Sequence, residues 1–151
     1  MRRTLSTLAA SGSALLLLGA LGFEHIGDLA PCRMCIWQRW PHLVAVMIGL
    51  VAFFLPWRAM SLLGALAAAT TGGVGVYHAG VEQGWWQGPT SCTSGDITGL
   101  STEDLFNQIM TAPIVRCDDI PWALGGISMA GWNAILSFVL MVLWITAARR
   151  Q

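Results

Sequence analysis

The sequence predicts an all-α membrane protein, a bundle of four transmembrane helices with one long loop that carries a short surface-lying helix. Hydrophobic residues make up 55% of the 151 residues and charged residues only 11%, which is too apolar for a soluble globule of this size. The charges lie between long uncharged runs, and each run can supply a helix that crosses a bilayer. We therefore expect one membrane domain over residues 1–151.

The first expected span covers residues 4–23, which carry no charge. At about 1.5 Å per residue, such a helix reaches across the roughly 30 Å hydrocarbon core. Arg2 and Arg3 precede the run, so a cleaved signal peptide is the alternative interpretation. We favour a retained helix, because the run is long and no small-x-small cleavage site stands at its end. An outer loop over residues 24–35 follows it.

The second expected span covers residues 36–57. The uncharged residues from Pro41 onward reach only about 22 Å, so the helix has to begin before this proline. A start near Ile36 leaves Pro41 early in the helix, where it removes about one backbone hydrogen bond. The same start places Cys35 at the helix N-terminus, where the helix dipole stabilises a thiolate.

The third expected span covers residues 59–81, and its many glycines and alanines suit close helix packing in lipid. The fourth covers residues 120–148, which is long enough to cross with tilt or to begin with a surface-lying turn. Asn133 falls inside this fourth span, where a polar amide is expected to make an interhelical hydrogen bond.

The outer loop over residues 82–119 contains clusters of glycine, proline, serine and threonine. Within it, the segment 101–104 matches a capping box that opens a short helix. The apolar residues of this helix share one side and are Leu105, Phe106, Ile109 and Met110. The helix is expected to lie flat on the membrane surface. A small lid packed on the bundle is the alternative.

The arginines predict the orientation in the membrane. Five of them lie on one side of the four-span arrangement, and all eight acidic residues lie on the other. The five are Arg2, Arg3, Arg58, Arg149 and Arg150. By the positive-inside rule both termini are cytoplasmic, and both loops that carry cysteines face the outside. The cysteines are therefore expected in an oxidising compartment.

The four cysteines form two pairs of unlike spacing. Two residues separate Cys32 from Cys35, whereas 24 residues separate Cys92 from Cys117. Four cysteines allow three pairings, of which a local pair and a loop-closing pair are the simplest. A structural bridge explains the second pair but not the first, because closing so short a loop constrains the unfolded chain little. Arg39, one helical turn after Cys35, is expected to favour a thiolate there.

The ordered motifs of the chain resemble those of the DsbB family of disulfide bond formation proteins. They are Pro31-Cys32-Arg33-Met34-Cys35-Ile36-Trp37-Gln38-Arg39 at the second span, Tyr77-His78 at the end of the third, Cys92 and Cys117 in the outer loop, and Trp122 and Trp132 leading into the fourth. The resemblance covers nearly the whole chain. It implies a multi-pass protein of the bacterial inner (cytoplasmic) membrane with periplasmic cysteines.

The resemblance also implies a protein-dithiol:quinone oxidoreductase. Such an enzyme reoxidises a periplasmic DsbA-like thiol oxidase by disulfide exchange, and it passes two electrons to ubiquinone or menaquinone. Its partners are then the thiol oxidase, membrane lipid and the quinone, and no nucleic acid is expected.

The resemblance assigns a role to each cysteine by position. Cys92 is attacked by the reduced partner, which releases Cys117 to attack Cys32. Cys35 then becomes the thiolate that faces the quinone, and Arg39 stabilises this thiolate and the developing quinone anion. These five residues are the expected catalytic set, and no metal is assigned to them.

His78 is implied to border the quinone ring, so Cys35, Arg39 and His78 form the expected quinone-binding set. Gln38 and His42 receive no role from the resemblance. Two alternatives stay open. One is the same scaffold serving a dedicated client. The other is a non-enzymatic bundle with structural disulfides or a zinc site of four cysteines.

Overall fold

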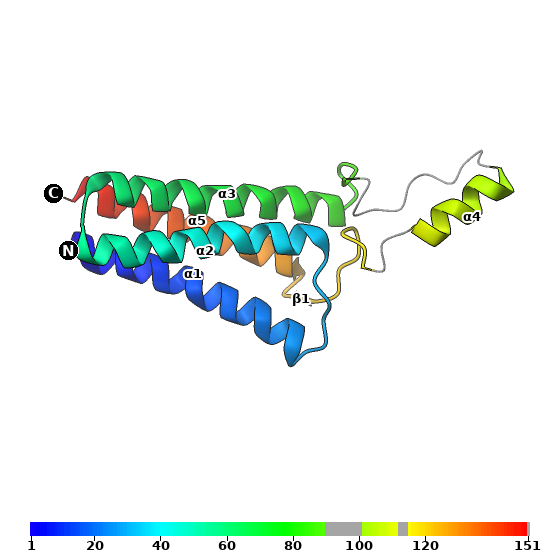
Figure 1. The fold of residues 1–151 in the computed structure, drawn as a ribbon, viewed down its shortest axis with the longest axis horizontal. Helices are drawn as coiled ribbons and strands as arrows, with labels where there is room; N and C mark the ends of the chain where they lie inside the picture. Colours follow the sequence, from blue (N-terminus) through cyan, green and yellow to red (C-terminus); the bar gives the residue numbers. More distant parts are fainter. Residues whose placement is uncertain (90–100, 112–114, 151) are drawn as a thin grey trace.

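The computed structural model describes residues 1–89, 101–111 and 115–150. In these ranges, four long helices run side by side and form a bundle (Figure 1). They are α1 (Arg2–His25), α2 (Arg33–Phe54), α3 (Arg58–Glu82) and α5 (Met129–Arg149). Each is long and apolar enough to cross a membrane. The predicted all-α, multi-pass architecture is thus confirmed.

Helix α2 begins at Arg33, three residues before the expected start at Ile36. Cys32 is the N-cap residue, and its Sγ accepts a hydrogen bond from the backbone N–H of Cys35 at 3.2 Å. This sulfur satisfies one of the N–H groups that a helix start leaves without an intrahelical partner. The observed start is thus slightly earlier than the expected one, and Cys35 lies inside the first turn of the helix. The helix ends at Phe54, shortly before a proline, and does not continue to residue 57.

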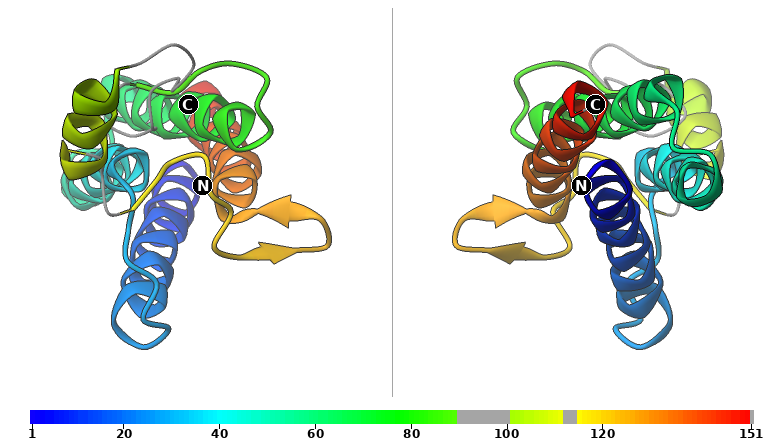
Figure 2. Two further views of the ribbon diagram at one scale, coloured as in Figure 1. Left: turned by 90° about the vertical axis from the view of Figure 1, so that its right-hand side faces the viewer. Right: turned by 90° about the vertical axis from the view of Figure 1, so that its left-hand side faces the viewer.

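Helix α5 begins nine residues later than the expected span over 120–148. The preceding segment forms an antiparallel hairpin of β1 (Ala123–Leu124) and β2 (Ile127–Ser128), which projects sideways from the bundle (Figure 2). Gly125 and Gly126 make its two-residue turn with φ of 61° and 79°, a conformation that glycine adopts without strain. The segment is as apolar as a span, so hydropathy alone did not separate it from the helix.

The short helix α4 (Thr102–Thr111) forms as the capping box predicts, because Ser101 Oγ accepts a hydrogen bond from the Asp104 N–H at 3.2 Å. It stands apart from the four long helices (Figure 1), so the lid packed on the bundle is not the observed arrangement. Phe106 and Met110 are exposed. The side chains of Leu105 and Ile109 lie outside the described residues, and the orientation of α4 on a membrane stays a prediction.

Helices α3 and α5 pack closely because glycine stands opposite a large ring. A Cβ atom added at Gly64 would lie 2.5 Å from two ring carbons of Trp144, whose side chain is fully buried. Real Cβ atoms do not come this close to such a ring without displacing it. The small residues predicted to allow close helix approach therefore do so at this contact.

Replacing Gly64 with alanine is expected to destabilise the bundle by about 1–3 kcal/mol, the usual cost of overfilling a packed core. The thermal unfolding midpoint in detergent measures this effect. Gly73→Ala is the matched control, because no atom of the described residues lies within 4 Å of a Cβ atom built at Gly73 on the same helix. An equal shift in both variants would contradict the explanation by ring overlap.

Candidate functional site

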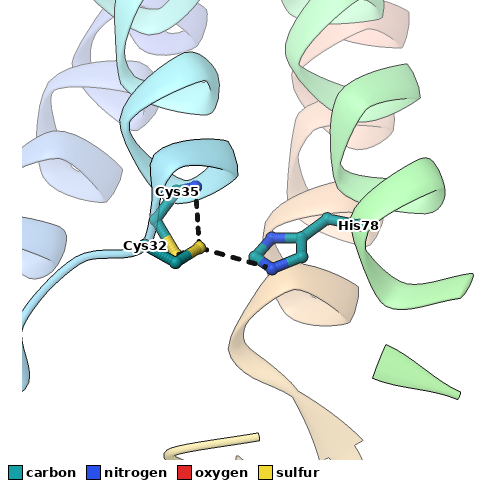
Figure 3. Close-up of side chains that lie close together, drawn as sticks. All are labelled: Cys32, Cys35 and His78. Atoms are coloured by element: carbon teal, nitrogen blue, oxygen red, sulfur yellow. Dashed lines mark hydrogen bonds between the residues drawn. The ribbon is translucent and has the colours of Figure 1, made fainter. Parts of the chain in front are cut away.

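The first feature of the site is the thiol pair at the start of α2. The side chains of Cys32 and Cys35 point toward one another, with their Sγ atoms 2.8 Å apart (Figure 3). Both cysteines are free in this structure. Cys32 is buried, with 5% of its surface exposed, and Cys35 is half-buried. The structure therefore brings the predicted local pair together as a dithiol.

The two thiols are not equivalent. The hydrogen bond to the Cys35 sulfur, followed by burial, raises the pKa of Cys32 above its ordinary value. A raised pKa favours the thiol form of Cys32, whose S–H can donate a hydrogen bond to the Cys35 sulfur. Cys32 also accepts the backbone N–H of Cys35, so its sulfur serves both the helix cap and the thiol pair.

This difference predicts selective alkylation of the reduced protein. At pH 8, iodoacetamide is expected to modify Cys35 about tenfold or more faster than Cys32, because a raised pKa leaves little thiolate at Cys32. Mass spectrometry of the labelled peptides gives both rates.

Repeating the labelling at pH 10 separates the pKa from simple burial. A raised pKa makes the rate at Cys32 climb further with pH than the rate at Cys35, whereas burial alone slows Cys32 by the same factor at both pH values. Alkylation rates of Cys32 and Cys35 that rise in parallel with pH would contradict the raised pKa of Cys32.

The second feature is His78 of α3, which lies against the thiol pair (Figure 3). Its Nε2 atom is 3.5 Å from Cys32 Sγ and 3.2 Å from the backbone oxygen of Cys117. Glu82, one turn later on α3, places Oε1 3.8 Å from the same nitrogen. The side chains of His78 and Glu82 are each 3% exposed. Glu82 was not among the predicted site residues, although its i, i+4 spacing from His78 was visible in the sequence.

Cys117 completes this cluster from the outer loop. It is fully buried and disulfide-bonded. Its predicted partner, Cys92, lies outside the described residues. Cys117 packs with Cys32, Met34 and Val81, so a residue from the loop between α3 and α5 is held beside the start of α2.

The donor atoms of Cys32, Cys35 and His78 lie within 4.8 Å of one another, close enough for three ligands of one metal ion. The alternative of a zinc site with four cysteine ligands does not agree with the structure. Zinc binds thiolates, and the Cys117 sulfur is engaged in a disulfide. Any metal at this place would have to use the histidine together with the thiol pair.

A third feature is a buried polar network that connects α2, α3 and α5. Asn133 Nδ2 donates to Gln38 Oε1 at 2.8 Å and to Thr71 Oγ1 at 3.2 Å. His42 Nε2 bonds to Asn133 Oδ1 at 2.9 Å. Gln38 Nε2 bonds to His78 Nδ1 at 2.9 Å. The predicted interhelical hydrogen bond of Asn133 is confirmed, while the partners of this amide were not predictable without the packing.

The fourth feature is a cavity of about 650 Å³ beside the thiol pair. Cys35, Arg39 and His78 line it together with residues of all four long helices. Most of its wall is apolar, with contributions from α1 that include Leu15 and Phe23. The expected quinone-binding set therefore borders one cavity that opens beside a thiol.

Arg39 lies in the wall of this cavity and is half-buried. Its Nη1 group forms an ion pair with Glu24 at the end of α1, and its Nη2 donates to the backbone oxygen of Ala20 at 3.4 Å. The buried Nε atom has no hydrogen-bond partner in the described part of the chain. Glu24 lies in the expected outer loop over residues 24–35, and its pairing with Arg39 was not predicted.

Comparison with known proteins gives one consistent result. The family model described as "Disulfide bond formation protein DsbB" matches residues 2–147. Disulfide bond formation protein B of Shewanella sp. (strain MR-4) is 32% identical over 137 residues, covering 86% of this chain and 78% of the relative. Disulfide bond formation protein B 2 of Pseudomonas aeruginosa is 32% identical over 145 residues, covering 89% and 83%. The protein of Paracidovorax citrulli is 29% identical over 172 residues, covering 98% and 89%. No solved structure matches the chain significantly.

Proposed function

The chain belongs to the DsbB family of disulfide bond formation proteins, and from this premise we propose that it reoxidises a periplasmic DsbA-like thiol oxidase and passes the two electrons to a membrane quinone. Membership in the family makes it a thiol oxidoreductase of disulfide bond formation. The observation that carries the finer proposal is the contact between three elements. These are a free dithiol, a disulfide-bonded loop cysteine beside it, and an apolar cavity lined by one of the thiols.

Electrons enter at the outer loop in this proposal. The thiolate of the reduced partner attacks Cys92 and forms a mixed disulfide, which releases Cys117 as a thiolate. The partner's second thiol then completes its own disulfide and leaves Cys92 reduced. One partner molecule has thus transferred two electrons to Cys92 and Cys117, the loop pair.

The electrons next move inward by a second disulfide exchange. Cys117 attacks Cys32 of an oxidised Cys32–Cys35 pair, forms a Cys32–Cys117 bridge and releases Cys35 as the thiolate. Attack of Cys92 on Cys117 restores the loop disulfide and leaves Cys32 and Cys35 as a dithiol. The observed state, a free Cys32 and Cys35 with Cys117 in a disulfide, corresponds to this point in the cycle.

The cavity supports a quinone as the electron acceptor. Cys35 and Arg39 line it, and the Arg39 Nε–H is a buried donor without a partner in the described residues. A quinone carbonyl oxygen accepts hydrogen bonds, and the apolar wall suits an isoprenoid tail, so the residues present fit this group. A quinone bound here would supply the acceptor for two electrons and two protons, and it is ubiquinone or menaquinone.

The charge distribution supports a location in the bacterial inner membrane with both termini in the cytoplasm. Both termini lie at one end of the bundle, and the start of α2 lies at the other (Figure 1). Arg2 holds the terminal end together, because Nε donates to the backbone oxygen of Arg150 at 3.0 Å and Nη1 donates to that of Pro56 at 2.8 Å. The positive-inside rule then places the dithiol on the periplasmic side.

A turnover assay tests the proposal. The protein is purified with native lipid, reduced DsbA-like partner is added, and the ultraviolet band of the quinone is followed. One quinone is expected to be reduced for each partner oxidised. Unchanged quinone, together with a stoichiometric amount of zinc in a metal analysis of the same sample, would favour the non-enzymatic bundle. Turnover with only one of several thiol oxidases would favour a dedicated client.

A further inference from the structure

The hydrogen bonds around His78 run in one direction, because two backbone oxygens in the network can only accept. Thr71 Oγ1 donates its single hydrogen to the backbone oxygen of Gln38 at 3.0 Å. The same oxygen atom of Thr71 must therefore accept the hydrogen bond from Asn133 at 3.2 Å, which orients the Asn133 amide with its NH2 group toward Thr71. Asn133 thus presents a donor to Gln38 Oε1 at 2.8 Å.

The second backbone oxygen belongs to Met34. Gln38 Nε2 donates to it at 3.1 Å, which leaves one hydrogen of the NH2 group for His78 Nδ1 at 2.9 Å. Turning the Gln38 amide would set its oxygen against the Met34 oxygen and its NH2 group against the NH2 group of Asn133. The amide orientation is therefore determined at both ends, and His78 Nδ1 is an acceptor without a hydrogen.

A neutral imidazole with a bare Nδ1 carries its hydrogen on Nε2. This Nε2–H faces the backbone oxygen of Cys117 at 3.2 Å and the sulfur of Cys32 at 3.5 Å. His78, Cys32 and Cys117 are all buried, which strengthens these contacts, and the Glu82 carboxylate oxygen lies farther from Nε2, at 3.8 Å. One N–H group thus joins the backbone of the loop cysteine to the sulfur of the helix cysteine.

We propose that Gln38 is a positioning residue, which holds His78 in the Nε2–H tautomer so that its ring keeps the Cys117 backbone beside Cys32. The consequence for catalysis rests on the proposed function. Disulfide exchange requires the Cys117 sulfur to approach Cys32 in line with the disulfide under attack. A fixed Cys117 backbone makes this geometry more frequent. The same tautomer disfavours a metal ion at Cys32, Cys35 and His78, because a ligating Nε2 would have to lose its hydrogen.

The tautomer of His78 can be measured in the wild-type protein, without any change at Gln38. The chain has three histidines, so single substitutions of His25 and His42 assign the 15N resonances of the third. His78 is expected to show an Nε2–H signal and an unprotonated Nδ1. An Nδ1–H signal for His78 would overturn the proposal, and it would leave the proposed function untouched.

Gln38→Met removes the donor to Nδ1 with little change in volume, and it is expected to give His78 a mixture of tautomers. Gln83→Met is the matched control. It makes the same chemical change at the exposed C-cap residue of α3, outside the polar network. Gln83→Met is expected to keep the Nε2–H tautomer. A single tautomer in Gln38→Met would overturn the role of Gln38.

The kinetic test follows the arrival of electrons at Cys32 and Cys35, the inner pair. Reduced partner is mixed with oxidised protein, the reaction is quenched with acid, and alkylation reports when Cys32 and Cys35 become thiols. Gln38→Met is expected to slow this step about tenfold, the order of effect of one lost hydrogen bond, while Gln83→Met stays within about twofold of wild type. Equal slowing in both variants would overturn the positioning role. Absence of transfer in the wild type would refute the proposed function, and the NMR result would still decide the tautomer.

Discussion

Cys35→Ala is expected to lower quinone reduction to the background rate, a loss of about a thousandfold or more. Without this sulfur, Cys32 has no thiol partner at 2.8 Å and the inner pair cannot return to a disulfide. The substitution also removes the Cys35 thiol from the wall of the apolar cavity. The measurement is the decay of the quinone ultraviolet band after reduced partner is added to the lipid-reconstituted protein.

Ile36→Ala serves as the control for this variant. Ile36 is the next residue on α2 and its side chain is 41% exposed, so its truncation changes the same helical turn without touching the dithiol. Turnover close to that of the wild type is expected. Full turnover in Cys35→Ala would refute the assignment of Cys35 as the sulfur that delivers electrons to the quinone.

Cys117→Ser is expected to trap a mixed disulfide between Cys92 and the oxidised partner. Without Cys117 the Cys92 thiolate is free to attack the partner's disulfide, which releases one partner thiol, and a serine hydroxyl cannot displace the partner from Cys92 afterwards. A band at the summed mass of the two proteins is therefore expected on a non-reducing gel, and a reductant removes it. In the wild type the adduct does not persist, because the Cys117 thiolate displaces the partner from Cys92 and reforms the loop disulfide.

Cys92→Ser is the matched variant and is expected to give no such band, since it lacks the sulfur that binds the partner. An adduct that persists in Cys92→Ser, or its absence in Cys117→Ser, would count against Cys92 as the entry point. A Cys32→Ser variant distinguishes the steps further. There the loop pair still accepts electrons, while the inner exchange has no sulfur to attack.

The position of Arg39 changes how its role is understood. The sequence places it one turn after Cys35, and the prediction was a cation that stabilises the thiolate. In the structure its charge is paired with Glu24 of α1, so part of its field is compensated. Its Nε–H has no partner among the described residues and needs a hydrogen-bond acceptor, which a quinone oxygen would provide in the proposed function. The ion pair also ties the outer end of α1 to the first turns of α2.

Several properties follow from the sequence by itself. Long uncharged runs determine the four membrane helices, because backbone groups in lipid have to be satisfied within a helix. The arginines predict the orientation, and the spacing of Cys32 and Cys35 predicts that they form a local pair. The capping box at Ser101 was enough to place α4. All of these depend on local composition or spacing, which a one-dimensional pattern contains.

The remaining features depend on how the helices pack against each other. Hydropathy did not distinguish the hairpin before Met129 from a helix, since both are uncharged and apolar. The cap formed by the Cys32 sulfur, the pairing of Glu24 with Arg39 and the contact of His78 with Cys117 join side chains from different elements. Such contacts depend on how the helices are rotated and packed against each other, and a single sequence does not contain that rotation. The direction of the hydrogen bonds from Asn133 to His78 also depends on helix rotation. Backbone oxygens determine this direction, and they meet the side chains of the network only in the assembled bundle.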